Sequence, residues 1–412
     1  MTRNKAAGIS TALTLKTGTR IKNRLFKSAM SEQLGDKHHN PTQRLIRLYR
    51  TWADGGIGLA VSGNVMVDRA ALGEPRNIVL DADSDLKMFE KWAAAGTGNG
   101  TCLWMQLNHP GKQAPKFLAK EPVAPSAVPL GKGLEKAFNL PRELSEPEIL
   151  ALIEKFATSA GLARGAGFEG IQIHGAHGYL VSQFLSPRHN RRKDRWGGSL
   201  ENRMRFVVAV FRKIRGVVGE DFPVGIKLNS ADFMRSGFSP EDSMAVAIRL
   251  QDEGIDLIEI SGGTYESPAM TGYKIKSATR KREAYFLDYA QRLSEAVAVP
   301  LVVTGGFRSG PAMRAALESG AAAMIGLARP LAMDPDFPNG VLGNPAHALQ
   351  CPHPTTGIAV VDKMAMLAIT WYEYQLARIA KGKRPDPDLN AWRVVARMFG
   401  SMGAHAFARR RS

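Results

Sequence analysis

Eight short apolar runs, separated by stretches with helical periodicity, fill the chain from about residue 24 to residue 330. The runs are residues 24–29, 57–63, 101–107, 170–174, 223–228, 257–261, 300–304 and 322–325. Strands that alternate with helices pair into a parallel sheet, and eight of them close a (β/α)8 barrel. A doubly wound sheet is the alternative, but its usual Gly-x-Gly-x-x-Gly turn does not follow the first run. The sequence therefore predicts an α/β TIM barrel.

The stretches between the runs carry signals for helix starts. Ser145 followed by Glu148 has the pattern of a capping box, and Ser239 precedes a proline at the first helical position. The expected helices are residues 41–54, 84–95, 146–165, 201–218, 240–253, 285–297 and 310–318.

Two segments depart from this alternation. Residues 110–143, rich in Pro, Gly and Lys, form a long loop after the third strand, where barrels place covers of the active face. Beyond the barrel, residues 361–381 and 391–407 have helical patterns. We therefore expect a barrel domain at 1–340 and a basic helical extension at 341–412. The extension is expected to dock on the barrel or to join subunits of a homo-oligomer, with a membrane surface as the alternative.

Composition narrows the class of protein. The two cysteines exclude a disulfide framework, and no stretch of 18 apolar residues or signal-type leader is present, so we expect a soluble cytoplasmic protein without a transmembrane segment. The formal net charge is +17, with a cluster RHNRRKDR at 188–195. Because no nucleic-acid-binding motif accompanies these charges, we expect a solvated basic surface and no nucleic-acid partner.

The segment IQIHGAHGYLVSQFLSPR at 171–188 gathers polar groups after the fourth run. His174 and His177 lie three residues apart, and Tyr179 follows. Two imidazoles can hold a developing oxyanion and a phenol can deliver a proton, which suits reduction of an unsaturated carbonyl. The alternatives are a metal site, for which two ligands are too few, or histidines that only satisfy backbone carbonyls in a buried turn. No metal site is expected.

Lys227 lies inside the otherwise apolar run at 223–228. A lysine that points into a barrel must find an anion or lower its pKa. It is a candidate for a Schiff-base lysine, as in barrel aldolases, for a fixed charge beside a cofactor, or for a structural salt bridge.

Two glycine-rich or small-residue turns follow the last two runs. VVTGGF at 302–307 contains Gly305 and Gly306, and IGLARP at 325–330 contains Arg329. Barrels commonly bind phosphate in these two loops, so the turns predict a phosphorylated ligand.

Several long segments resemble one known family. In order, they are NRLFKSAMSE, WMQLNHPGKQ, VAPSAV, HGAHGYLVSQFLSPRHNRRKDRWGGSLENRMRF, VVTGGF and IGLARPL. They are very similar to the motifs of the old yellow enzyme family of FMN-dependent NAD(P)H oxidoreductases. The likeness covers about residues 10–340.

The resemblance implies non-covalently bound FMN and assigns its contacts. The matching residues are Ser28, Ala29 and Met30 along the flavin, Ser31 beside flavin O4, Gly63 and Asn64 next to the ring, Gln106 on the pyrimidine edge, Lys227 near N1 and O2, and Gly305, Gly306, Ala328 and Arg329 at the phosphate. This assignment favours the cofactor role of Lys227 over the aldolase.

The resemblance also implies a ping-pong reaction in which NAD(P)H reduces FMN and the flavin passes a hydride to an activated alkene. His174 and His177 match the pair that holds the substrate carbonyl, and Tyr179 matches the proton donor. Two residues depart from the pattern: Gln33 stands where some members have a tyrosine, and Lys227 where arginine is common. No cysteine cluster follows the barrel, unlike the multidomain dienoyl-CoA reductase type.

Overall fold

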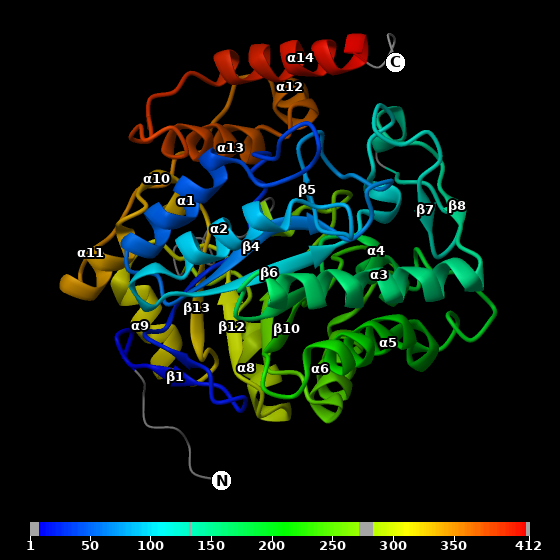
Figure 1. The fold of residues 1–412 in the computed structure, drawn as a ribbon, viewed down its shortest axis with the longest axis horizontal. Coiled ribbons are helices and arrows are strands. Elements are labelled where there is room, and N and C mark those ends of the chain that lie inside the picture. The colour runs from blue at the N-terminus through cyan, green and yellow to red at the C-terminus, as the bar shows by residue number, and fades with distance from the viewer. Residues whose placement is uncertain (1–7, 132, 272–282, 409–412) are drawn as a thin grey trace.

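Eight parallel strands form a closed ring in the computed structural model, which describes residues 8–131, 133–271 and 283–408 (Figure 1). They are β3 (Leu25–Lys27), β4 (Leu59–Met66), β6 (Cys102–Asn108), β9 (Ile171–Gly175), β10 (Val224–Asn229), β11 (Leu257–Ser261), β12 (Leu301–Thr304) and β13 (Met324–Leu327). Pairing of β3 with both β4 and β13 closes the ring. The predicted barrel and its eight strands are confirmed. A short strand, β5 (Ile78–Val79), adds to β4 outside the ring.

Within the described residues, seven long helices cover the outside of the ring, and all seven were predicted. They are α1 (Gln43–Asp54), α2 (Leu86–Gly96), α3 (Glu146–Gly165), α5 (Leu200–Val218), α6 (Pro240–Glu253), α8 (Leu287–Ala296) and α9 (Gly310–Glu318). The capping box of Ser145 and Glu148 is present, and the Ser239 side chain accepts a hydrogen bond from the backbone of Asp242. Three shorter helices were missed because they span too few turns to show a period. They are α4 (Leu180–Leu185), α10 (Arg329–Met333) and α11 (Phe337–Gly343).

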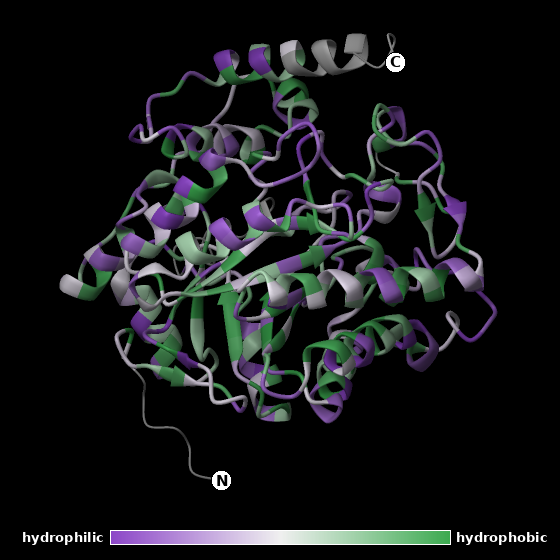
Figure 2. Cartoon of the chain, in the orientation of Figure 1, coloured by the Kyte–Doolittle hydropathy of each residue, from purple (hydrophilic) through white to green (hydrophobic). Residues whose placement is uncertain are grey.

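The lower half of the barrel interior is apolar. Phe26, Val61 and Trp104 pack there with Leu257, and Figure 2 shows the hydrophobic colour of the strands. The N-terminal hairpin of β1 (Leu13–Thr14) and β2 (Arg20–Ile21), which the sequence did not reveal, adds apolar side chains to this cluster. The floor of the barrel is therefore filled rather than open.

A layer of polar side chains lies above this floor, toward the carboxyl ends of the strands. Because successive side chains of a strand alternate between faces, Gln106 shares the inward face with Trp104. The other members point inward from neighbouring strands in register, as Lys227 of β10 does beside Glu259 of β11. Along β6 and β11, the inward-facing residues change from apolar to polar within two positions, from Trp104 to Gln106 and from Leu257 to Glu259.

The long loop after β6 folds over the carboxyl end of the barrel and contains two paired short strands, β7 (Val123–Ala124) and β8 (Arg142–Glu143). Two residues of the basic cluster at 188–195 hold this loop in place. Buried His189 lies 2.7 Å from Lys112 Nζ, and the Arg192 guanidinium donates to the carbonyls of Pro125 and Leu144. These two members of the cluster therefore serve the fold.

The C-terminal extension lies across one side of the barrel (Figure 1). Its helices are α12 (Ala359–Met364), α13 (Leu367–Ile379) and α14 (Ala391–Ala408). The single helix predicted over 361–381 is wrong, because Met366 adopts a left-handed backbone conformation with φ 45° and separates α12 from α13. Helix α13 packs against α10 and α1, so the extension docks on the barrel. The domain division at residue 340 stays a prediction.

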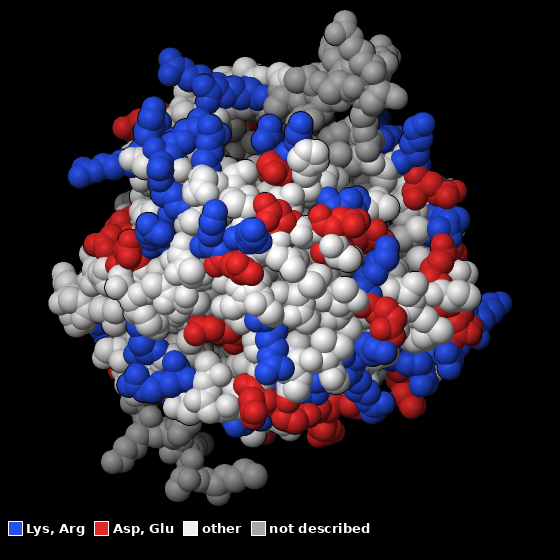
Figure 3. Space-filling view, viewed as in Figure 1, with Lys and Arg blue, Asp and Glu red and all other residues white. Residues whose placement is uncertain are grey.

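Charge is mixed over the face in Figure 3, although basic side chains gather at the upper left. Figure 1 places α1 and α13 in that part of the view. In the described part of the chain, no helix combines the length and apolar character needed to cross a membrane.

Candidate active site

His174, His177 and Tyr179 meet at the carboxyl end of β9. The ring centroids of His174 and His177 lie 5.1 Å apart, and those of His174 and Tyr179 lie 4.8 Å apart. Tyr179 occupies the N-cap of α4, so the short turn between strand and helix brings all three rings together. The predicted grouping of these three residues is present in the structure.

Two polar residues of neighbouring strands hold His177. Its backbone N–H donates to Asn229 Oδ1 at 3.1 Å, and its Nε2 hydrogen-bonds with Ser261 Oγ at 2.8 Å. The residue has a positive φ of 61°, which is uncommon outside glycine. The sequence reading missed Asn229 and Ser261, although both end a strand of the ring with a polar side chain.

Both imidazoles are held in the neutral form. Burial lowers the pKa of His174 and of His177 well below the usual value, and the positive charge of Lys227 adds to this effect. A neutral imidazole keeps one N–H donor. Because the site is buried, a hydrogen bond from that donor is stronger than it would be in water.

Tyr179 is held as a protonated phenol. Its hydroxyl lies 2.9 Å from the hydroxyl of Tyr265 and also contacts the Asn64 side chain. Burial raises the pKa of Tyr179, and the nearby carboxyl group of Glu74 raises it further. The phenol therefore carries a proton through the neutral pH range. Tyr265 lies in the loop after β11 and gave no signal in the sequence.

The polar layer beneath the histidines contains a buried ion pair. Lys227 Nζ lies 3.2 Å from Glu259 Oε1, and both side chains are buried. Glu259 also accepts hydrogen bonds from Gln172 and Thr304, each at 2.8 Å. The charge of Lys227 is thus compensated within the barrel, which is the structural pairing considered from the sequence.

Gly63 lies against the segment that follows β3. Its N–H donates to the Tyr49 hydroxyl at 2.9 Å. A Cβ atom at this position would lie 2.5 Å from the carbonyl oxygen of Met30 and 2.7 Å from Glu32 Oε2, so only glycine fits. The neighbouring Ser28 is anchored on the other side by Thr304, at 2.9 Å between hydroxyl oxygens. Ser28, Ala29 and Met30 are thereby fixed between β4 and β12.

Gly305, Gly306, Ala328 and Arg329 come together where β12 and β13 end. Both glycines have positive φ, 126° and 91°, which a side chain would strain. The ring of Tyr285, a residue that the sequence analysis did not identify, covers the two glycines. A Cβ atom at Gly306 would lie 2.6 Å from this ring. Its hydroxyl accepts a hydrogen bond from Arg329 at 3.2 Å.

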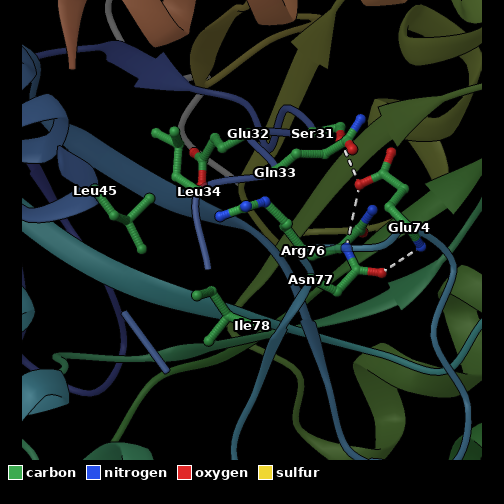
Figure 4. Close-up of a pocket in the computed structure, with 10 residues that line it drawn as sticks. Ser31, Glu32, Gln33, Leu34, Leu45, Glu74, Arg76, Asn77 and Ile78 are labelled. Atoms are coloured by element: carbon green, nitrogen blue, oxygen red, sulfur yellow. Dashed lines mark hydrogen bonds between the residues drawn. The ribbon is translucent and has the colours of Figure 1, made fainter. Parts of the chain in front are cut away.

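Ser31 and Gln33 line a small pocket (Figure 4). Its lining is Ser31, Glu32, Gln33, Leu34, Leu45, Asn64, Glu74, Arg76, Asn77 and Ile78. Asn64 connects the pocket to Tyr179, because its side chain contacts the phenol. Ser31 donates a hydrogen bond to Glu74.

Comparison with known proteins decides the family. The model of the NADH:flavin oxidoreductase / NADH oxidase family matches residues 11–344. The NADH-dependent flavin oxidoreductase iccE of Talaromyces variabilis is 37% identical over 412 residues, which cover 91% of this chain and 99% of that protein. The chain belongs to this family.

Other members of the family are longer. The NADH-dependent flavin oxidoreductase iliE of Neonectria sp. (strain DH2) is 40% identical over 358 residues, 81% of this chain but 47% of that protein. The chain thus spans about half the length of this relative. Among solved structures, 2-naphthoyl-CoA reductase has a TM-score of 0.77 at 25% identity and covers 90% of this chain and 58% of its own. Morphinone reductase, at a TM-score of 0.71 and 23% identity, covers 86% of this chain and 94% of its own and shows the same fold.

The old yellow enzyme family expected from the motifs is therefore confirmed, and the protein is an oxidoreductase. The family uses FMN, with NAD(P)H as the reductant. The residues present fit such a group. Gln106 Oε1 is buried and has no hydrogen-bond partner among the described residues, so it can accept a bond from a flavin N–H. The glycine pair and Arg329 offer a small, positively charged turn suited to phosphate.

Proposed function

We propose that this protein reduces the C=C bond of α,β-unsaturated carbonyl compounds. The observation that carries the proposal is the convergence of two neutral imidazoles and one protonated phenol at the carboxyl end of β9. Such a set can bind a carbonyl oxygen and protonate a nearby carbon, and these are the two tasks that alkene reduction leaves to the protein.

His174 and His177 bind the substrate carbonyl in this proposal. An N–H from each ring points at the oxygen and stabilises the negative charge that develops there as hydride arrives at the β-carbon. The hydrogen bond with Ser261 holds the His177 ring, and the bond from the backbone N–H to Asn229 holds the turn that carries it. The substrate is thereby oriented before reaction.

Tyr179 supplies the proton for the α-carbon. Its high pKa keeps the proton on the phenol until the carbon becomes basic. Tyr265, 2.9 Å away, is placed to return a proton to Tyr179 after turnover.

FMN, when bound, supplies the hydride that it has received from the nicotinamide nucleotide. We propose that the residues holding it are those assigned from the family motifs, with Gln106 on the ring edge, Lys227 beside the ring, and Gly305, Gly306 and Arg329 at the phosphate. Ser28, Ala29, Met30, Ser31, Gly63, Asn64 and Ala328 complete the proposed contacts. Several relatives are named as NADH-dependent, so NADH is the proposed donor.

The test is a visible absorption spectrum of the purified protein, followed without oxygen as nucleotide and then an enone are added. We expect a yellow protein that is bleached by NADH and regains its colour with the enone. Bleaching without recovery would exclude enone reduction. A colourless protein that takes up no added FMN would exclude the whole scheme.

A lyase that uses Lys227 as a Schiff base is the weaker candidate. Its nucleophile would have to be a free amine, whereas Lys227 is paired with Glu259 inside the barrel. Borohydride trapping with substrate would reveal this activity.

A further inference from the structure

Lys27, the last residue of β3, is a buried lysine that the proposed reaction does not use. Its neighbour Phe26 packs inside the ring, so the Lys27 side chain points outward to α1. There its ammonium lies 4.4 Å from the ring centroid of Trp52 and 4.9 Å from that of Tyr49. The residue has no exposed surface, and a buried ammonium is costly unless it is paired and hydrogen-bonded. The groups around Lys27 must therefore compensate a full positive charge.

The partners of Lys27 come from three segments of the chain. Its Nζ lies 3.5 Å from Glu32 Oε1, so the two residues form an ion pair, and Glu32 is buried as well. The ammonium also donates to the carbonyl of Val61 on β4 at 2.7 Å and to the Tyr49 hydroxyl at 3.3 Å. Lys27 thus joins β4, α1 and the segment that follows β3.

Tyr49 extends these contacts to Gly63. The Tyr49 hydroxyl donates a hydrogen bond to Glu32 Oε1 and accepts one from the Gly63 N–H at 2.9 Å. The Glu32 carboxyl also lies against Gly63, where a Cβ atom would come within 2.7 Å of Oε2. Lys27, Glu32 and Tyr49 therefore form a buried cluster that contacts Gly63 and both ends of residues 28–31.

The four residues 28–31 lie between the two members of the ion pair. Lys27 precedes Ser28 and Glu32 follows Ser31, so the pair connects the two ends of this segment. Residues 28–31 lie outside the helices and strands of the structure, so side-chain contacts must hold much of their conformation. A segment that is already ordered binds a ligand more tightly than one that must be ordered on binding.

We propose that the buried cluster of Lys27, Glu32 and Tyr49 positions the flavin, by holding residues 28–31 and Gly63 in the conformation that FMN binds. The proposal rests on the proposed function, which places these two segments beside the flavin ring. The three residues of the cluster are positioning residues, because they act on the segments that contact the cofactor. An ion pair on the outer side of β3 thereby controls a ligand at the carboxyl ends of the strands.

The experiment measures the affinity for FMN and the visible absorption spectrum of bound FMN in two variants. Tyr49→Phe removes the hydroxyl that links the ion pair to Gly63, and Lys27→Met removes the buried charge but keeps a side chain of similar length. Flavin is removed from each purified protein, and FMN is titrated back while the quenching of its fluorescence is followed. We expect each variant to bind FMN at least about tenfold more weakly, equivalent to about 1.4 kcal/mol. At saturating FMN, the visible absorption maxima should shift, because the surroundings of the ring have moved.

Asp256→Asn is the matched control. Asp256 Oδ2 lies 2.6 Å from Arg215 Nη2, and both residues are buried. This ion pair lies at the amino end of β11, away from the proposed flavin site. Breaking it should lower the free energy of unfolding, which chemical unfolding of the flavin-free proteins measures, but should leave the FMN affinity and the spectrum as in the parent.

Parent-like FMN affinity and spectrum in Tyr49→Phe would overturn the proposal, and so would an equal loss of FMN affinity in Asp256→Asn. If Lys27→Met does not fold, Tyr49→Phe decides between these outcomes. Enone turnover by the parent is measured in parallel. A parent that binds FMN without reducing enones contradicts the proposed function, while the comparison of FMN affinities still reports on the cluster.

Discussion

The hydroxyl oxygens of Tyr179 and Tyr265 lie 2.9 Å apart, and the buried ring of Tyr179 also lies against the ring of His174. Tyr179 comes from the turn after β9, whereas Tyr265 comes from the loop after β11. One phenol must donate to the other, so the pair forms a short proton-carrying chain next to the histidines. Its two members should contribute unequally to catalysis, because only Tyr179 contacts the histidine rings.

Replacing Tyr179 by phenylalanine should slow alkene reduction by about 10²–10⁴-fold, the usual contribution of a positioned general acid. Reduction of the flavin by NADH needs no proton from this phenol and should keep its rate. Stopped-flow measurement of the two half-reactions separates these effects. Tyr265→Phe is the comparison and should slow alkene reduction less. An unchanged rate in Tyr179→Phe would remove Tyr179 as the proton donor.

Glu259→Gln should raise the reduction potential of the bound flavin. The substitution keeps the hydrogen-bonding shape but leaves the charge of Lys227 uncompensated, which favours the negatively charged reduced flavin. We expect a rise of roughly 30 mV, equivalent to about 1.4 kcal/mol for a two-electron couple. Lys227→Met should shift the potential the opposite way. Redox titration against a reference dye measures both, and equal potentials in all three proteins would place Lys227 away from the flavin.

His177→Asn should make stability less dependent on pH. The pKa of His177 is lowered in the folded protein, so below pH 6.5 the unfolded chain binds a proton that the folded chain does not. This imidazole therefore lowers the free energy of unfolding as the pH falls below the pKa that His177 has in the unfolded chain. Between pH 7.5 and pH 5.5, the variant should lose about 1.4 kcal/mol less free energy of unfolding than the parent.

Urea unfolding at several pH values measures this difference. Asparagine is a suitable replacement because it tolerates the positive φ of 61° at this position. Parallel pH curves for the two proteins would show that His177 is protonated in the fold.

Gly63→Ala should destabilise the protein by about 1–3 kcal/mol, the usual cost of overpacking. The new methyl group would lie 2.5 Å from the carbonyl oxygen of Met30, so the segment from Ser28 to Ser31 must shift. FMN affinity should fall together with stability if that segment lies along the flavin. Gly343→Ala, where no neighbouring atom lies within 4 Å, is the control. Chemical unfolding and flavin-release titration measure the two effects, and equal behaviour of both variants would contradict the close packing at Gly63.

The sequence by itself determined the barrel. Its eight runs and seven long helices all appear, because apolar periodicity and capping residues act over neighbouring positions. The same local logic found His174, His177 and Tyr179, which lie within six residues and need only one turn to meet. It failed at Met366, where a backbone reversal interrupts an otherwise continuous helical pattern.

Only the tertiary structure decided which distant residues complete the site. Glu259 beside Lys227, Tyr265 beside Tyr179, and Tyr49 beside Gly63 each join segments whose spacing in the chain carries no signal of contact. Ring closure sets the first two pairs, since it brings the carboxyl ends of all eight strands to one face, and packing of α1 against the ring adds Tyr49 from outside. Local sequence pattern fixes each element, but the charges and hydrogen bonds that tune the site depend on how those elements pack.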